Sequence, residues 1–295
     1  MIDLRDRDGL LHLAQVVANV RAHAAESQFM LVGAKARDVL LWHQYGITPP
    51  RSTTDVDMAF WVADWPTFQR LRANLLGSGR FTPAQAIHRL HSRIGTPLDM
   101  LPFGGIESAS GQIAWPPADN PVMSVLGYDA AFASSHTVLL PGEQTLAVIA
   151  LPMLALLKLF TWEDRHRDQP RKDAVDLMFL LESAFQAVGI ERLHDEAPGL
   201  VDADDFDVDL ASAWLLGSQA RQAATHSSQR GPEILVRATD ILDRETDPAG
   251  PLGLIGELRA AEPEKARLML TAFLNGLRLI ERLGDVRGTG PKATT

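Results

Sequence analysis

The stretch "RSTTDVDMAFWV", Arg51 to Val62, decides how the first half of this chain folds. It places two carboxylates, Asp55 and Asp57, one residue apart at the start of an apolar run. Aspartate is depleted in strands, and a buried carboxylate without a partner costs several kcal/mol. The pair therefore either ends a turn before a strand or binds a cation.

The spacing of the two aspartates suits a metal ion. In a strand, residues i and i+2 point to the same face, about 6.5 Å apart. Asp55 and Asp57 can then share one cation or hold two side by side. Carboxylate oxygens suit Mg²⁺, which proteins bind with a few carboxylates plus substrate phosphates. One D-x-D in a chain rich in aspartate is a weak indication alone, so its neighbours matter.

Two neighbouring segments of the first half carry related features. In "MLVGAKARDVLL", a strand, Gly33 and a helix follow one another, and such a glycine lets backbone N–H groups approach a phosphate. Many joints of this kind are only turns. In "GTPLDMLPF", Asp99 interrupts a strand that is otherwise apolar. It either completes a metal site opposite the D-x-D or faces water on an edge strand.

A third segment, "LPMLALLKLFTWEDRHRDQPRKDAVDLMFLL", lies further on. Lys158 interrupts an apolar helix face, and it either extends to solvent or reaches a triphosphate as a point charge. Asp173 and Asp176 lie on one side of the following helix. They either pair with nearby cations such as Arg171 or contribute to a site.

The pattern along the chain predicts an α+β fold: a mixed sheet flanked by helices in residues 1–145, then an all-helical domain in residues 146–295. Predicted helices are 9–25, 34–46, 65–79, 152–165, 171–188, 207–225, 231–245 and 264–284. Predicted strands are 28–33, 55–62, 86–94, 97–103, 111–116 and 136–141.

Taken in order, these motifs resemble the nucleotidyltransferase superfamily. More closely, residues 29–182 resemble the AbiEii/AbiGii group of type IV toxin–antitoxin systems, which includes the MenT-type enzymes. The resemblance implies a catalytic core whose helical domain contributes lysine and aspartate residues to the cleft. The implied catalytic residues are Asp55, Asp57, Lys158 and Asp173. The implied metal ligands, for Mg²⁺ or Mn²⁺, are Asp55, Asp57 and Asp99. The implied nucleotide-binding residues are Gly33, Ala34, Lys35, Arg37, Lys158 and Asp176.

The chain departs from the family pattern at one position. The family glycine is normally followed by serine, whose hydroxyl touches the terminal phosphates, whereas this chain has Ala34. Tight triphosphate binding then depends on other groups, and Lys35 and Arg37 are the candidates.

Composition narrows the class of protein. The 295 residues are 46% hydrophobic and 22% charged, as in ordinary globular proteins. The absence of cysteine excludes disulfides, thiolate metal sites and a cysteine nucleophile, and it fits a reducing cytoplasm. No apolar run approaches the roughly 18 residues that a membrane span needs. The N-terminal stretch "MIDLRDRDGL" lacks the apolar centre of a signal peptide, so we expect a cytoplasmic protein that does not bind membranes.

The resemblance implies an Mg²⁺-dependent transfer of NMP from an NTP to an acceptor hydroxyl. The first acceptor to consider is the 3′ end of a tRNA, with the chain as a toxin that has a cognate antitoxin. The net charge of −9 argues against a broad RNA-binding face. The alternatives are nucleotidylation of a small aminoglycoside-like molecule or of a protein, and a catalytically inactive nucleotide-binding module.

Overall fold

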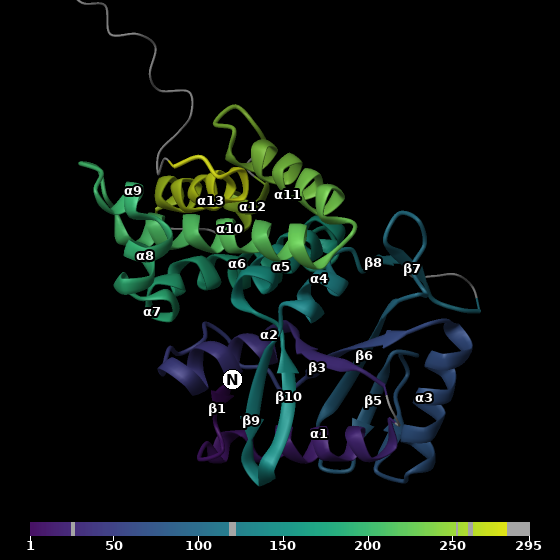
Figure 1. The fold of residues 1–295 in the computed structure, drawn as a ribbon. Coiled ribbons are helices and arrows are strands. Elements are labelled where there is room, and N and C mark those ends of the chain that lie inside the picture. The colour runs from purple at the N-terminus through teal and green to yellow at the C-terminus, as the bar shows by residue number, and fades with distance from the viewer. Residues whose placement is uncertain (25–26, 118–121, 252, 259–261, 282–295) are drawn as a thin grey trace, which may run out of the picture. The chain divides into compact units, whose positions relative to one another are not determined.

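The computed structural model describes residues 1–24, 27–117, 122–251, 253–258 and 262–281. The chain forms two compact units, Met1–Leu154 and Ala155–Thr295. The first has a mixed sheet flanked by helices and the second is helical, which confirms the predicted fold class (Figure 1). The division between the units falls inside helix α5 (Leu151–Arg165), a few residues after the boundary predicted from the sequence.

The first unit is organised by a mixed sheet that has eight strands within the described residues. Their order across the sheet is β1-β9-β10-β2-β3-β6-β5-β4. The strands are β1 (Ile2–Asp3), β2 (Phe29–Val32), β3 (Val56–Val62), β4 (Phe81–Pro83), β5 (Arg89–Ser92), β6 (Pro97–Gly104), β9 (His136–Leu140) and β10 (Gln144–Val148). Strand β3 runs antiparallel to β2 and parallel to β6, so it lies near the centre of the sheet.

Burial along the central strands explains their sequences. All four residues of β2 are buried, as expected for a short apolar strand covered on both faces. In β3 the residues Val56, Met58, Phe60 and Val62 are buried on one face. The opposite face carries Asp57 at its start and the exposed Trp61 near its end. The period of two thus directs the acidic side chains of this segment away from the packed face.

Helices and a two-stranded sheet of β7 and β8 complete the described part of the first unit. They are η1 (Asp8–Leu10), α1 (Leu11–His23), α2 (Gly33–Arg37), η2 (Asp38–His43), α3 (Trp65–Gly77), β7 (Gln112–Ala114), β8 (Val122–Ser124), α4 (Tyr128–Ala133) and η3 (Pro141–Glu143). Helices α1 and α3 contact each other and pack on β10 and β3 respectively. The carboxylate of Asp64 caps α3 by accepting a hydrogen bond from the Thr67 backbone N–H at 2.7 Å.

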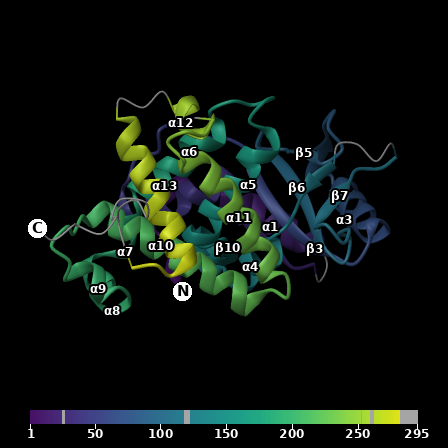
Figure 2. The same cartoon turned by 90° about the horizontal axis from the view of Figure 1, so that it is seen from above.

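The second unit consists of helices. After α5 they are α6 (Lys172–Glu182), α7 (Ala184–Val188), α8 (Ile190–Glu196), α9 (Pro198–Val201), α10 (Val208–Ser227), α11 (Gly231–Thr246), α12 (Gly253–Leu258) and α13 (Pro263–Arg278). Helices α10 and α13 lie side by side in both views (Figures 1 and 2). Among the described residues, no helix is both long enough and apolar enough to cross a membrane.

Several predicted elements differ in the structure. The helix predicted over 34–46 is α-helical only as far as Arg37 and then widens into the π-helical η2. The helix predicted over 171–188 divides at Ser183 into α6 and α7. Strands β1, β4, β8 and β10 and helix α4 have no counterpart among the predicted elements.

Two glycines set the distance between α10 and α13. A Cβ atom at Gly276 would overlap the carbonyl oxygen of Trp214 and lie 2.8 Å from the backbone nitrogen of Ser218. A Cβ atom at Gly217 would overlap the carbonyl oxygen of Phe273. The two backbones therefore touch, and only glycine fits on either side of the contact.

This contact generates a stability prediction. We expect Gly276→Ala to lower the free energy of unfolding by about 1–3 kcal/mol, because the new methyl group forces the two helices apart. Gly256→Ala in α12 is the matched control, since no atom lies within 4 Å of a Cβ atom there. Urea denaturation of the full chain would measure both. Equal effects of the two substitutions would contradict the packing argument.

Candidate active site

The two aspartates of the D-x-D lie against the glycine joint in the folded chain. Asp57 pairs with Val32 across β2 and β3, so its side chain stands beside Gly33, the next residue. A Cβ atom at Gly33 would overlap Asp57 Oδ2 and lie 3.0 Å from its Cγ. Gly33 also has a φ of +69°, which disfavours other residues. The joint is therefore glycine both for its backbone conformation and for space beside Asp57.

Strand register brings the third aspartate to the same place. Asp57 pairs with Asp99 in the parallel β3–β6 ladder, and Asp99 pairs with Arg89 in the antiparallel β6–β5 ladder. Paired residues on neighbouring strands point to the same face, with strands about 4.8 Å apart. One cross-strand row thus carries Asp57, Asp99 and Arg89 on a single face. Asp55 lies two residues before Asp57 and joins the same group.

Arg89 connects two of the three carboxylates. Its Nε donates to Asp99 Oδ1 at 2.6 Å, and its Nη2 donates to Asp99 Oδ2 at 2.7 Å. The same Nη2 donates to Asp55 Oδ2 at 3.1 Å. The hydrogen bonds with Asp99 hold the pKa of Arg89 above its ordinary value. The sequence offers this arginine only as one of several basic residues near the site, because nothing in "HRLHSRI" reveals which strand residue will face it.

The arginine changes what the carboxylates can bind. Among the described residues, no three histidine or acidic side chains are arranged to hold a metal ion together. Both oxygens of Asp99 accept hydrogen bonds from Arg89, whereas Asp55 contributes one oxygen to the guanidinium. Asp55 and Asp57 carry the oxygen ligands that a divalent cation prefers. Asp99 would have to share its carboxylate with the guanidinium or lose its bonds to Arg89.

The residues that follow Gly33 have different environments. Ala34 is buried. Lys35 is half-buried, and its Nζ donates to the carbonyl oxygen of Thr53 at 2.9 Å. Burial lowers the pKa of Lys35, which Asp38 and Asp55 partly offset. Its position near Asp55 keeps the predicted contact with a phosphate group feasible.

Arg37 does not line the site. Its side chain is completely buried, and Nη2 donates to Asp38 Oδ1 at 2.6 Å and to the carbonyl oxygen of Arg51 at 3.0 Å. A nucleotide contact by Arg37 stays a prediction, and it would require these hydrogen bonds to break. The guanidinium instead ties the segment before the D-x-D to the helix after Gly33.

The predicted residues of the second unit gather in a cluster of their own. Lys158 Nζ donates to Asp173 Oδ1 at 2.9 Å and to Asp176 Oδ2 at 2.7 Å, and all three side chains are buried. Arg165 Nε donates to Asp173 Oδ2 at 2.8 Å. Burial alone would raise the pKa of Asp173, but Lys158 and Arg165 outweigh it and lower the pKa to about 2. A nucleotide contact by Lys158 would require these bonds to break.

An acidic residue that the sequence did not single out, Glu257, lies near this cluster. Glu257 accepts hydrogen bonds from Trp162 Nε1 at 3.0 Å and from the Arg171 backbone N–H at 2.9 Å, and it lies 3.1 Å from His166 Nδ1. It therefore ties α12 to the end of α5 and the start of α6.

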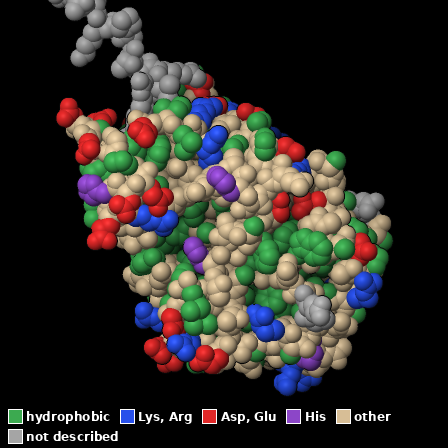
Figure 3. Space-filling model, viewed as in Figure 1, with side chains coloured by type: hydrophobic (Ala, Val, Ile, Leu, Met, Phe, Trp, Pro, Cys, Tyr) green, Lys and Arg blue, Asp and Glu red, His purple; other side chains and the backbone are tan. Residues whose placement is uncertain are grey.

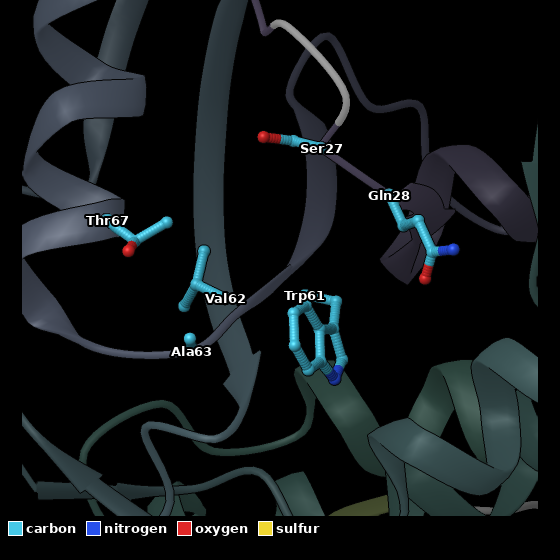
Figure 4. Close-up of a pocket in the computed structure, with 6 residues that line it drawn as sticks. All are labelled: Ser27, Gln28, Trp61, Val62, Ala63 and Thr67. Carbon is cyan, nitrogen blue, oxygen red and sulfur yellow. The ribbon is translucent and has the colours of Figure 1, made fainter.

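A cavity of about 500 Å³ lies at the far end of β3 from Asp57. Ser27, Gln28, Trp61, Val62, Ala63 and Thr67 line it (Figure 4). The exposed Trp61 indole lies against the backbone of Gly104, where a Cβ atom would be 2.6 Å from its Cδ1. Trp65 instead packs against Trp115, with ring centroids 5.3 Å apart. The cavity lacks the carboxylates, so it is separate from the candidate site.

Family models, curated proteins and solved structures were compared with the chain, and they do not identify its function. No protein-family model and no curated protein sequence matches the chain. One similar solved structure is that of the antibiotic-resistance factor ANT(2'')-Ia, an aminoglycoside nucleotidyltransferase. It shares 15% identity with a TM-score of 0.36, over 72% of this chain and 95% of that one. Similarity at this level assigns no function to the chain.

The Gly33 contact can be tested by a pair of substitutions. We expect Gly33→Ala to cost about 1–2 kcal/mol for its positive φ and a further 1–3 kcal/mol, roughly, for the overlap with Asp57. Gly79→Ala is the control, because Gly79 has a φ of +66° but no atom within 4 Å of a Cβ position. Thermal unfolding would compare the two variants. If Gly33→Ala is no more destabilising than Gly79→Ala, Asp57 does not press on Gly33.

The lowered pKa of Asp173 predicts how stability depends on pH. A group whose folded pKa lies below its unfolded value of 3.8 stabilises the fold above that pH and loses this contribution as the pH falls through about 2. We expect Asp173→Asn to be less stable than wild type at pH 6. That difference should shrink by about 1 kcal/mol between pH 6 and pH 3.

Urea denaturation at the two pH values would measure the change, with the exposed Asp204→Asn as a control. A difference between wild type and Asp173→Asn that stays constant with pH would contradict the assigned ion pairs.

Proposed function

We propose that this chain is a metal-dependent nucleotidyltransferase that transfers NMP from an NTP to an acceptor hydroxyl. The observation that supports this most is the placement of Asp55, Asp57 and Asp99 at one end of neighbouring strands, with the backbone of Gly33 directly against Asp57. Strand pairing alone does not explain two carboxylates in direct register on adjacent strands with a third two residues earlier, because like charges there destabilise a sheet. A bound divalent cation would explain them.

The metal site in this proposal is built from Asp55 and Asp57. Their oxygens are hard ligands at the spacing of residues i and i+2, which suits Mg²⁺ or Mn²⁺. Such an ion would neutralise the triphosphate and polarise the α-phosphorus. Lys35 would add a positive charge to the phosphates by exchanging its hydrogen bond with the Thr53 carbonyl for one with a phosphate oxygen.

Asp99 is the group that would act on the acceptor. It lies across the strand pair from Asp57, and Arg89 fixes its orientation by two hydrogen bonds. The acceptor oxygen forms a bond to the α-phosphorus as the bond to the β-phosphate oxygen breaks, and pyrophosphate leaves. The hydroxyl proton passes to Asp99. Positioning and charge stabilisation carry most of the catalysis of such a step.

The acceptor in this proposal is the 3′ end of a tRNA. This choice, a toxin role and an antitoxin partner rest on the sequence resemblance. Arg89 and Lys35 supply positive charge close to the carboxylates.

The acidic surface elsewhere favours a cationic small molecule as the second candidate acceptor. Figure 3 shows acidic side chains gathered over α8 and α9, where the exposed residues are Glu191, Asp195, Glu196, Asp202, Asp204 and Asp205.

The decisive experiment is a transfer assay. Purified protein would be incubated with Mg²⁺, each radiolabelled NTP in turn, and either total tRNA or an aminoglycoside. We expect label on tRNA from wild type, and a rate at least about a hundredfold lower from Asp57→Asn, because a ligand of the ion is lost. Asp6→Asn, an exposed carboxylate of the same unit, should transfer at the wild-type rate.

The acceptors separate the candidates. Label on the aminoglycoside alone would replace tRNA by a small cationic acceptor. Transfer that Asp57→Asn or removal of Mg²⁺ with EDTA leaves intact would contradict the proposed site. Nucleotide binding without transfer to any acceptor would indicate an inactive nucleotide-binding module.

A further inference from the structure

One cation, the Arg89 guanidinium, already lies among the carboxylates of the candidate site. Arg89 bonds to both oxygens of Asp99 and to one oxygen of Asp55, as a fork that matches a carboxylate edge. The Asp99 side chain is only 12% exposed and that of Arg89 is 33% exposed. The pair is thus shielded from water on the side of the sheet, where screening by solvent and salt is weaker.

The backbone holds this arrangement in place. Arg89 lies directly opposite Asp99 in the β5–β6 ladder, so its side chain begins next to its partner. The Arg89 backbone N–H donates to the Ala86 carbonyl oxygen at 3.0 Å, and its own carbonyl accepts from the Ala84 N–H at 3.3 Å, so the turn before β5 is tied to the start of the strand. The strand pairing and this turn together place the Arg89 side chain beside Asp99.

Arg89 offsets negative charge at the place where a second metal ion would have to bind. Asp55 and Asp99 carry two negative charges when ionised, and the single positive charge of Arg89 is bonded to both of them. A second divalent ion would have to displace Arg89 from Asp99 or share a carboxylate with the guanidinium.

We propose that Arg89 takes the place of a second metal ion, so that the site binds a single divalent cation at Asp55 and Asp57. In this arrangement Arg89 is a positioning residue that orients Asp99 and supplies the positive charge that a second ion would bring. The inference rests on the proposed function and narrows it to one metal ion assisted by a guanidinium.

The test is the number of Mn²⁺ ions that the full chain binds, measured from free Mn²⁺ by electron paramagnetic resonance without nucleotide. We expect one ion per wild-type chain and two per Arg89→Gln chain, because removal of the guanidinium releases Asp99. Arg89→Lys should bind one ion, since it keeps the charge. Arg93→Gln is the matched control, since Arg93 bonds to the Gly79 carbonyl oxygen, and it should also bind one ion.

Thermal unfolding gives a second readout. Removal of Arg89 leaves Asp55 and Asp99 without their guanidinium, so Mn²⁺ should raise the thermal midpoint of Arg89→Gln more than that of wild type. An equal or smaller rise in the variant would overturn the inference.

The outcomes distinguish this inference from the function on which it rests. Two ions on the wild-type chain, or one on Arg89→Gln, overturn the role of Arg89 and leave the transfer reaction standing. One ion on wild type together with no transfer activity overturns the proposed function and retains the cation site. A wild-type chain that binds no Mn²⁺ overturns both.

Discussion

Repulsion among Asp55, Asp57 and Asp99 is the constraint on which the candidate site depends. Two carboxylates about 5 Å apart repel by roughly 3 kcal/mol at an effective dielectric constant of 20. The sheet nevertheless places Asp57 and Asp99 in direct register. The arrangement is tolerable because Arg89 neutralises part of the charge and because Gly33 leaves room for the Asp57 carboxylate. The proposed divalent ion would lower the repulsion further.

The two units use similar residues with opposite consequences. In the second unit, Lys158 and Arg165 balance Asp173 and Asp176, two positive charges against two negative ones. That cluster is closed, largely buried and internally satisfied, so it stabilises the helices. In the first unit, three carboxylates face one guanidinium and are partly exposed. An unbalanced, accessible group can bind a ligand, and this contrast supports the proposal that the chemistry takes place in the first unit.

The local sequence pattern predicts individual strands and their acidic residues, but it does not predict which strands pair. The alternation in "DVDMAFWV", the glycine after "FMLV" and the interruption at Asp99 are properties of neighbouring residues, and the structure places all three at one end of the sheet. Arg89, the closed cluster of Lys158 and the burial of Arg37 depend on which distant segments meet. Strand β10 was missed because "QTLAV" is short and its partner β2 lies more than a hundred residues earlier. Single-sequence periodicity does not contain that information.

Net charge is a poor guide to the acceptor, because salt screens charges beyond about 8 Å in the cell. The residues 181–295 hold 12 basic and 19 acidic side chains, which supplies −7 of the total of −9. What an incoming acceptor meets is set by the groups closest to Asp57. Without metal, these are three carboxylates against Arg89 and Lys35, a net charge of −1. The proposed divalent ion would change this sum to +1. The site would then repel phosphate without the ion and attract it with the ion, so an acidic chain would still bind an anionic substrate.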